Sequence, residues 1–175
     1  MTSKATSLSR APRGTAIAIA LGSNLGDREA HLAFGLSALP GFITKLRQSR
    51  WHDTDPFGVS ADHPRYLNGV VVGETELTAR ELLDRLLAIE RAAGRERPSA
   101  MAPRTLDLDL ILYGDKKIEE PGLTVPHPRF RDRLFVLEPL AEVAPDWIDP
   151  VTGRSVADLF SALRQQTGQA RPGPS

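Results

Sequence analysis

The sequence predicts an α+β fold, in which helices cover a mainly antiparallel sheet, from three observations. The chain has 175 residues, 41% of them hydrophobic and 25% charged, which is typical of one globular domain. Apolar runs of strand length alternate with segments whose apolar residues recur at helical spacing. These segments follow one another as strand, helix, strand, strand, helix, strand, with further helices after them.

The first strand and helix are followed by a second strand and a long loop. The apolar run Thr15–Leu21 predicts a buried strand. A glycine-containing turn then leads to a helix that Asp27 can cap and that ends near Leu39, before a Pro-Gly pair. Phe42–Trp51 predicts the second strand, and the prolines in His52–Arg65 predict a long loop.

The second half repeats the pattern of a strand, a helix and a strand. Tyr66–Glu74 predicts the third strand. Thr78 and Glu81 are spaced as a capping box, and the helix that they begin reaches Gly94. After a basic segment, Leu106–Tyr113 predicts the fourth strand.

A helix from about Arg131 to Val143 and a short helix from near Ser155 complete the elements. The order βαββαβ is that of ferredoxin-like folds, in which two helices pack on one face of the sheet, and the later helices can cover the other face. We expect a flexible N-terminal extension over 1–13, a single domain over 14–164 and a flexible tail over 165–175.

Composition excludes several classes of protein. The 22 basic residues are balanced by 22 acidic residues, which argues against a broad nucleic-acid surface. There is no cysteine for disulfides or thiolate metal sites, and the longest apolar run, Ala16–Leu21, is too short to span a membrane. Residues 1–13 weakly resemble a transit peptide, although a disordered extension is the favoured interpretation. We expect a cytoplasmic monomer without nucleic-acid or membrane partners.

Asp107 and Asp109 are the strongest candidates for chemistry. In a strand they share one face, with Cα atoms roughly 6.5–7 Å apart. From the pattern alone, a solvated polar face is the more frequent explanation. Aspartate is disfavoured in strands, however, and neighbouring like charges repel, so a divalent cation would relieve the repulsion.

Arginines cluster on both sides of this strand in the sequence. Guanidinium groups bind phosphate oxygens, and Mg²⁺ is typically held by one or two carboxylates together with substrate phosphates. The arrangement therefore indicates phosphoryl-type transfer. No Walker A loop, Gly-x-Ser-x-Gly motif or zinc-ligand spacing is present. The arginines are Arg91, Arg95, Arg97, Arg104, Arg129, Arg131 and Arg133.

Four segments resemble the 6-hydroxymethyl-7,8-dihydropterin pyrophosphokinase family of folate biosynthesis. Pro103–Gly114 matches the family signature closely. Ala20–Gly26, Tyr66–Asn68 and Leu123–Pro128, the last continuing to Arg133 and Phe135, match in the same order. The resemblance spans roughly Ala16 to Trp147 and implies transfer of a pyrophosphoryl group from ATP to the pterin hydroxymethyl oxygen, with AMP as the other product.

The resemblance also implies the ferredoxin-like fold with additional helices and strands, and it implies the site residues. Asp107 and Asp109 would bind Mg²⁺, two ions in the family, and would count among the catalytic residues with Arg95, Arg97 and Arg104. Arg95 and Arg97 would come from a mobile loop before the fourth strand. The ATP site would comprise Glu90, Arg97, Arg104, Leu110, Thr124, His127 and Arg133, and the pterin site Gly22, Thr54, Asp55, Phe57, Asn68 and Phe135.

The sequence departs from the family pattern at four positions. Ala100 and Met101 stand where a basic and an aromatic residue are common, and Gly122 and Pro128 replace side chains that often contact ATP. These changes bear on affinity more than on reaction type.

Two other classes remain as alternatives: an RNA-binding module and a non-catalytic ligand-binding regulator. RNA-binding modules of this fold need aromatics on the inner strands, which Ala16–Leu21 and Val70–Glu74 lack.

Overall fold

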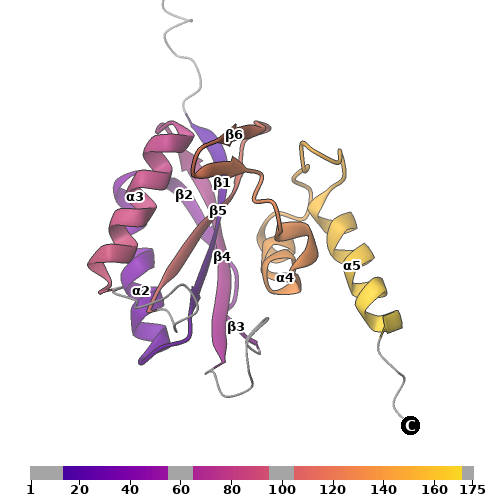
Figure 1. Ribbon diagram of the computed structural model, residues 1–175, viewed down its shortest axis with the longest axis horizontal. Helices are drawn as coiled ribbons and strands as arrows, with labels where there is room; N and C mark the ends of the chain where they lie inside the picture. Colours follow the sequence, from indigo (N-terminus) through magenta and orange to yellow (C-terminus); the bar gives the residue numbers. More distant parts are fainter. Residues whose placement is uncertain (1–13, 55–64, 95–104, 171–175) are drawn as a thin grey trace, which may run out of the picture.

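A computed structural model describes residues 14–54, 65–94 and 105–170. Its main sheet has the antiparallel strand order β2-β4-β1-β5, and β3 also pairs with β4 (Figure 1). This is the predicted ferredoxin-like topology. The elements are β1 (Thr15–Ser23), α2 (Arg28–Ala38), the 3-10 turn Leu39–Gly41, β2 (Thr44–Gln48), β3 (His52–Thr54), β4 (Tyr66–Thr75), α3 (Ala79–Ala92), β5 (Asp107–Tyr113), β6 (Ile118–Glu120), β7 (Leu123–Val125), the 3-10 turn Phe130–Asp132, α4 (Leu134–Val143) and α5 (Val156–Ala170).

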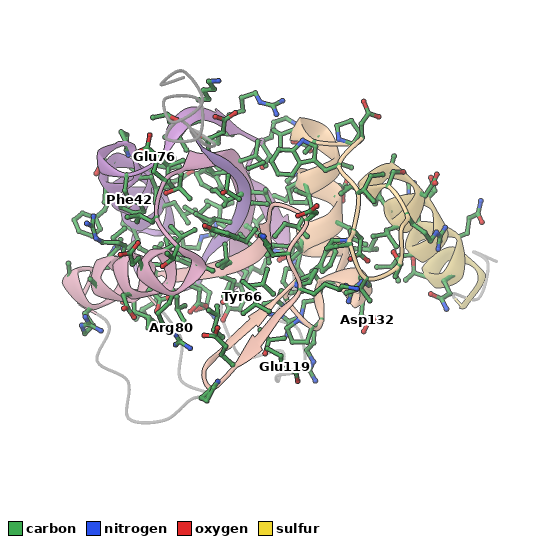
Figure 2. All side chains as sticks on the ribbon, turned by 90° about the horizontal axis from the view of Figure 1, so that it is seen from above. Phe42, Tyr66, Glu76, Arg80, Glu119 and Asp132 are labelled. Carbon is green, nitrogen blue, oxygen red and sulfur yellow. The ribbon has the colours of Figure 1, made fainter. Side chains whose placement is uncertain are left out.

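Helices cover both faces of this sheet, as the sequence predicts (Figure 1). On one face, Ile17, Ile19 and Leu21 of β1 join Leu82 and Leu86 of α3 in a core that α2 also covers. On the other face, a second core joins the sheet to α4 and α5, and side chains fill the space on both sides (Figure 2). Because both faces of β1 are covered, its residues from Ile17 onward are all buried.

The predicted helix starts are confirmed. The Asp27 side chain accepts a hydrogen bond from the Ala30 amide at 3.1 Å. The Thr78 hydroxyl accepts from the Glu81 amide at 3.1 Å, and the Glu81 carboxylate accepts from the Thr78 amide at 2.9 Å. Each contact satisfies amide groups that have no partner within the first turn of a helix.

Two predictions about the region after α2 have the wrong bounds. The strand expected over Phe42–Trp51 is present but shorter, as β2 over Thr44–Gln48. Ser49 follows it and pairs with Val70 through its amide, which donates to the Val70 carbonyl at 2.9 Å, and through its hydroxyl, which accepts from the Val70 amide at 3.0 Å. The loop expected from His52 instead begins with β3, whose three residues pair with β4. A strand this short has too few residues to show an alternating pattern.

Three further differences lie near the C-terminal end. The β6–β7 hairpin is an additional pair of strands whose position the sequence did not indicate. The helix expected from Arg131 begins at Leu134, after a 3-10 turn whose Phe130 is fully buried. The helix expected to be short is α5, which continues to Ala170, so the tail boundary expected at Gln165 lies inside it.

Candidate active site

The register of the main sheet places three predicted site residues in one row. Gly22 of β1 pairs with Asn68 of β4 on one side and with Asp107 of β5 on the other. Directly paired residues of antiparallel strands project to the same face. The face is the one covered by α4, because Ala20, which shares it with Gly22, belongs to the second core. The candidate pterin and metal residues therefore meet across β1.

The alternation in β5 is confirmed. Leu106, Leu108 and Leu110 are buried, whereas Asp107 is half-buried and Asp109 is exposed. On β1, the residues opposite the two aspartates are Gly22 and Ala20. Neither of these two residues has a side chain larger than a methyl group.

Glu90 fixes the main chain between the aspartates. It lies near the end of α3, is 7% exposed, and its Oε2 accepts a hydrogen bond from the Leu108 amide at 2.7 Å. Since β5 is an edge strand of the main sheet, this amide is satisfied by a side chain. Glu90, which the resemblance assigns to the ATP site, thus directly supports the strand that carries the two aspartates.

Asn68 and Thr54 of the candidate pterin site are in contact. The Asn68 side chain is largely buried, and its Nδ2 donates to the Thr54 hydroxyl at 2.6 Å. A Cβ on Gly22 would lie 2.8 Å from Asn68 Oδ1, closer than such atoms approach. Glycine at position 22 therefore allows the Asn68 amide to lie across β1.

His127 lies beside β5 and is neutral at physiological pH. Its amide donates to the Ile111 carbonyl at 2.9 Å, and its Nδ1 accepts from the Arg129 amide at 3.1 Å. Burial lowers the pKa of His127 to about 4, with further lowering from the positive charges of Arg133 and Arg129. Because Nδ1 accepts a hydrogen bond, the proton is assigned to Nε2, which is then a donor for an anionic oxygen.

Two arginines after β7 have different roles. The Arg133 guanidinium lies over the Phe135 ring, 5.5 Å from its centroid, so a candidate ATP residue contacts a candidate pterin residue. Arg131 instead donates to both carboxylate oxygens of buried Asp149, at 2.6 and 2.9 Å. Arg131 therefore stabilises the fold through this ion pair. Its placement among the arginines expected to bind phosphate is corrected.

The other predicted residues are in several places. Thr124 is exposed on β7, and the Leu110 side chain lies in the first core, on the face opposite the aspartates. An ATP contact by Leu110 would therefore come from its main chain. Lying outside the described residues are Arg95, Arg97, Arg104, Asp55 and Phe57, as well as Ala100 and Met101.

The donor set fits magnesium. Within 14–54, 65–94 and 105–170, no group of three or more His, Asp or Glu residues is placed to hold a metal ion. Asp107 and Asp109 supply two carboxylates, which is the number of protein ligands usual for Mg²⁺ that is also bound by substrate phosphates.

Within 14–54, 65–94 and 105–170, no helix has the length and apolar character needed to cross a membrane.

Sequence reasoning missed two side-chain networks around β3. Asp53 binds Arg28 and Arg65, and Glu142 of α4 accepts hydrogen bonds from Arg50 and His52. Burial alone would raise the pKa of Glu142, but the hydrogen bonds from Arg50 and His52 lower it overall. Both networks join residues far apart in the chain. The only sign of them in the sequence is the number of charged residues in His52–Arg65, the segment expected to be a loop.

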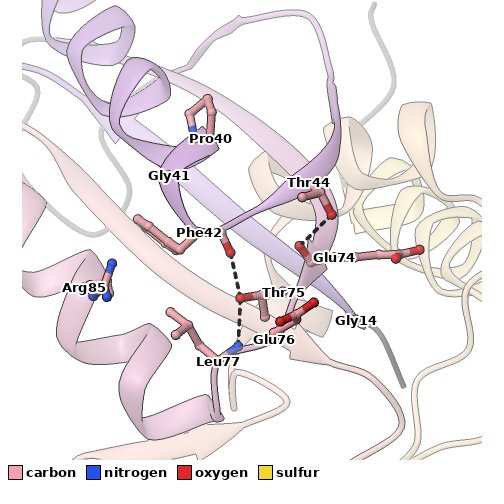
Figure 3. A pocket seen from close by; sticks show the side chains of 10 residues that line it. All are labelled: Gly14, Pro40, Gly41, Phe42, Thr44, Glu74, Thr75, Glu76, Leu77 and Arg85. Atoms are coloured by element: carbon pink, nitrogen blue, oxygen red, sulfur yellow. Dashed lines mark hydrogen bonds between the residues drawn. The ribbon is translucent and has the colours of Figure 1, made fainter. Parts of the chain in front are cut away.

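A cavity of about 330 Å³ lies at the other end of the β1–β4 pair, away from Gly22 (Figure 3). Its lining includes Phe42, Glu74, Leu77 and Arg85, and none of the predicted site residues. The Arg85 guanidinium lies over the Phe42 ring, 5.4 Å from the centroid. The cavity is thus separate from the candidate active site.

Comparison with known proteins shows the family to which the chain is similar. The family model of 7,8-dihydro-6-hydroxymethylpterin-pyrophosphokinase matches residues 18–145. A Synechocystis protein named 2-amino-4-hydroxy-6-hydroxymethyldihydropteridine pyrophosphokinase is 45% identical over 83% of this chain and 74% of its own length. A Pseudomonas aeruginosa protein of the same name is 39% identical over 89% of this chain and 96% of its own length.

Solved structures show the same fold. A Plasmodium falciparum HPPK-DHPS structure with pteroate superposes with a TM-score of 0.70 at 13% identity, covering 93% of this chain. This chain spans 45% of that longer Plasmodium chain. From the family match over residues 18–145 and the identities to the two bacterial relatives, the chain belongs to the 7,8-dihydro-6-hydroxymethylpterin-pyrophosphokinase family.

Proposed function

We propose that this chain is an ATP-dependent pyrophosphokinase of folate biosynthesis. It transfers the pyrophosphoryl group of ATP to 6-hydroxymethyl-7,8-dihydropterin and releases AMP, as the names of its family and relatives imply. The observation that carries the proposal is the row Asn68, Gly22, Asp107 in the sheet. It brings a residue suited to a pterin ring next to a residue suited to a metal–phosphate complex.

The pterin site would use Asn68 and Phe135. The Asn68 amide can pair with the amide edge of the ring, and the Thr54 hydroxyl holds its Nδ2. An aromatic face beside a flat heterocycle contributes about 0.5–1.5 kcal/mol beyond burial, and Phe135 supplies one such face. Gly22 leaves room for the Asn68 side chain. Asp55 and Phe57 are proposed to complete this site.

The phosphate site would use neutral and cationic donors together. His127 would donate from Nε2, Thr124 from its hydroxyl and Arg133 from its guanidinium, with Glu90 supporting the strand beside them. Main-chain atoms of Leu110 are proposed to contact the nucleotide. Arg95, Arg97 and Arg104 are proposed to bind the transferring phosphates, because guanidinium forks match phosphate oxygens.

Asp107 and Asp109 would hold Mg²⁺, and we propose two ions. Bound magnesium would neutralise phosphate charge and make the β-phosphorus more open to attack. The hydroxymethyl oxygen attacks that phosphorus and releases its proton to water. The bond from the β-phosphorus to the oxygen bridging the α- and β-phosphorus atoms breaks, and AMP leaves with that oxygen. The side chains listed above orient the two substrates for this displacement.

We also propose a cytoplasmic monomer that acts without nucleic acid. The equal numbers of acidic and basic residues support the last point, because nucleic-acid-binding surfaces normally carry a basic excess. Gel filtration tests the oligomeric state. Cell fractionation tests the compartment, and a gel-shift assay tests nucleic-acid binding.

The direct test is product analysis. Purified protein is incubated with ATP, Mg²⁺ and 6-hydroxymethyl-7,8-dihydropterin, and nucleotides are separated by ion-exchange chromatography. We expect AMP to accumulate in step with the pterin diphosphate, and neither to form without the pterin. Formation of ADP would contradict pyrophosphoryl transfer. Binding of both substrates without turnover would support the alternative of a non-catalytic regulator.

A further inference from the structure

A carboxylate and two arginines join the three chain segments that supply Gly22, Thr54 and Asn68. Asp53 of β3 accepts from Arg28 through two nitrogens, each at 3.3 Å, and from Arg65 Nε at 2.9 Å. Two main-chain contacts close the network: Arg28 Nη1 donates to the Arg65 carbonyl at 2.9 Å, and Arg65 Nη2 donates to the Asp53 carbonyl at 3.0 Å. We refer to these three residues as the Asp53 clamp.

Each member of the clamp is close in sequence to a candidate pterin residue. Arg28 is the first residue of α2, which follows the turn after Gly22. Asp53 immediately precedes Thr54, and Arg65 immediately precedes β4, which contains Asn68. The clamp therefore fixes the ends of the segments from which the site is built.

The position of Arg28 is unfavourable for the helix itself. A cation at a helix N-terminus faces the positive end of the helix dipole, where acidic residues are preferred. Its guanidinium points instead to Asp53 and to the carbonyl of Arg65, which are 25 and 37 residues away in the chain. The preference for an acidic residue at this position is overridden by a long-range contact. Such departures from local preference are typical of functional sites.

The clamp has the geometry of a network and is partly exposed. The exposed side-chain fractions are 28% for Arg28, 49% for Asp53 and 52% for Arg65. Single exposed ion pairs contribute little to stability, but paired guanidinium contacts and networks are the exception. The hydrogen bonds from Arg28 and then Arg65 lower the pKa of Asp53, so its carboxylate is charged at neutral pH.

We propose that Asp53 is a positioning residue for the pterin. Through Arg28 and Arg65 it holds β3 against the start of β4, so that the Thr54 hydroxyl stays 2.6 Å from Asn68 Nδ2 and the Asn68 Oδ1 stays beside Gly22. This inference rests on the proposed function. The clamp would strengthen binding of the pterin and leave binding of ATP unchanged.

The test compares Asp53→Asn with the matched control Glu120→Gln. Glu120 is also an exposed carboxylate, 54% accessible, paired at 3.0 Å with an arginine, but it lies on β6. For Asp53→Asn we expect the KM for 6-hydroxymethyl-7,8-dihydropterin to rise about three- to fivefold, as loss of one exposed network permits. The KM for ATP and kcat should stay within about twofold of wild type, and Asp53→Glu should restore much of the loss. Glu120→Gln should leave all three constants unchanged.

Further measurements separate positioning from general stability. Hydrogen exchange of the His52–Thr54 amides should become faster in Asp53→Asn, while exchange in α3 stays unchanged. Each of Arg65→Gln and Asp53→Asn should raise the pterin KM. The double variant should raise it by less than the two single effects combined, because both act through one carboxylate. Arg65→Gln alone gives a second variant should Asp53→Asn fail to fold.

Several results would overturn the proposal. An unchanged pterin KM in an active Asp53→Asn enzyme would overturn the clamp's role and leave the proposed function intact. An equal rise in both KM values would show a general loss of structure and would also overturn it. An inactive wild-type protein would overturn both the function and the inference built on it.

Discussion

Asp107 and Asp109 determine the charge at the candidate site. They lie on one face of an edge strand, opposite small residues of β1, with leucines on the other face. Two carboxylates on one face of a strand fit the ligand set of a bound Mg²⁺, which is the role proposed for them.

Replacing either aspartate should abolish turnover and leave the fold intact. For Asp107→Asn or Asp109→Asn we expect kcat to fall at least about 100-fold, the scale of losing a metal that neutralises transferring phosphate. Steady-state AMP production at saturating Mg²⁺ measures this, and circular dichroism checks the fold. Asp84→Asn, on the exposed side of α3, is the control. Near-normal rates in either site variant would remove the ligand assignment.

Gly22 should be intolerant of a side chain. Because an added Cβ would lie 2.8 Å from Asn68 Oδ1, Gly22→Ala should displace the Asn68 amide and raise the pterin KM by about tenfold, the cost of one misplaced hydrogen bond. The matched control is Gly41→Ala, where a Cβ would meet nothing within 4 Å. Equal pterin KM values in the two variants would contradict the placement of Asn68 in the pterin site.

At the scale of elements, α3 and β5 are linked by one buried carboxylate. The Glu90 side chain accepts from the Leu108 amide, and the residues on either side of Leu108 are the two aspartates. The end of a helix therefore positions the strand that would hold the metal. Loss of this hydrogen bond would therefore affect both the stability of β5 and the position of the two aspartates.

Glu90→Ala should lower both stability and turnover. A buried amide left without its acceptor costs about 1–3 kcal/mol. Thr78→Ala removes the cap of the same helix and should cost about 1 kcal/mol. Urea unfolding should show a loss in both variants, whereas kcat should fall only in Glu90→Ala. If kcat fell equally in both, Glu90 would act through stability alone.

The elements also show where prediction from sequence succeeds. The capped amphipathic helix α3 was predicted almost to the residue, and the buried strand β1 was predicted from its correct start to two residues before its end. The short strands β3, β6 and β7 were missed, since three residues carry no readable period and their pairing depends on distant partners.

The same reasoning applies to the candidate site. The alternation in β5 was sufficient to place Asp107 and Asp109 on one face. The contact between Thr54 and Asn68 needed the β3–β4 pairing, which the sequence does not show. The pairing of Arg131 with Asp149 was likewise hidden by a separation of 18 residues.

At the scale of the whole molecule, the C-terminal region packs on the face of the sheet that carries the site (Figure 1). Arg131 and Asp149 tie the turn before α4 to the segment before α5. Burial would raise the pKa of Asp149, but hydrogen bonds from Arg131, Thr152 and Val151 lower it overall. A carboxyl group with a lowered folded-state pKa stabilises the fold above its ordinary pKa.

Stability should therefore fall in acid through Asp149. Its contribution is present above the ordinary value of 3.8 and is lost as pH falls below that value through the lower folded-state pKa. The difference in unfolding free energy between wild type and Asp149→Asn, from urea titrations, should be large at pH 7 and shrink toward pH 2. A difference independent of pH would contradict the assignment.

The central claim is that metal–nucleotide and pterin meet at the row Asn68, Gly22, Asp107. Paramagnetic broadening of ¹⁵N-labelled protein by Mn²⁺ with ATP tests it most directly. We predict that the amide signals of these residues lose intensity, while those of Glu76 and Leu77 persist, because Thr75 is about 24 Å along β4 from Asn68. Broadening centred on Glu76 and Leu77, or unchanged broadening at the row in an Asp107→Asn/Asp109→Asn double variant, would contradict it.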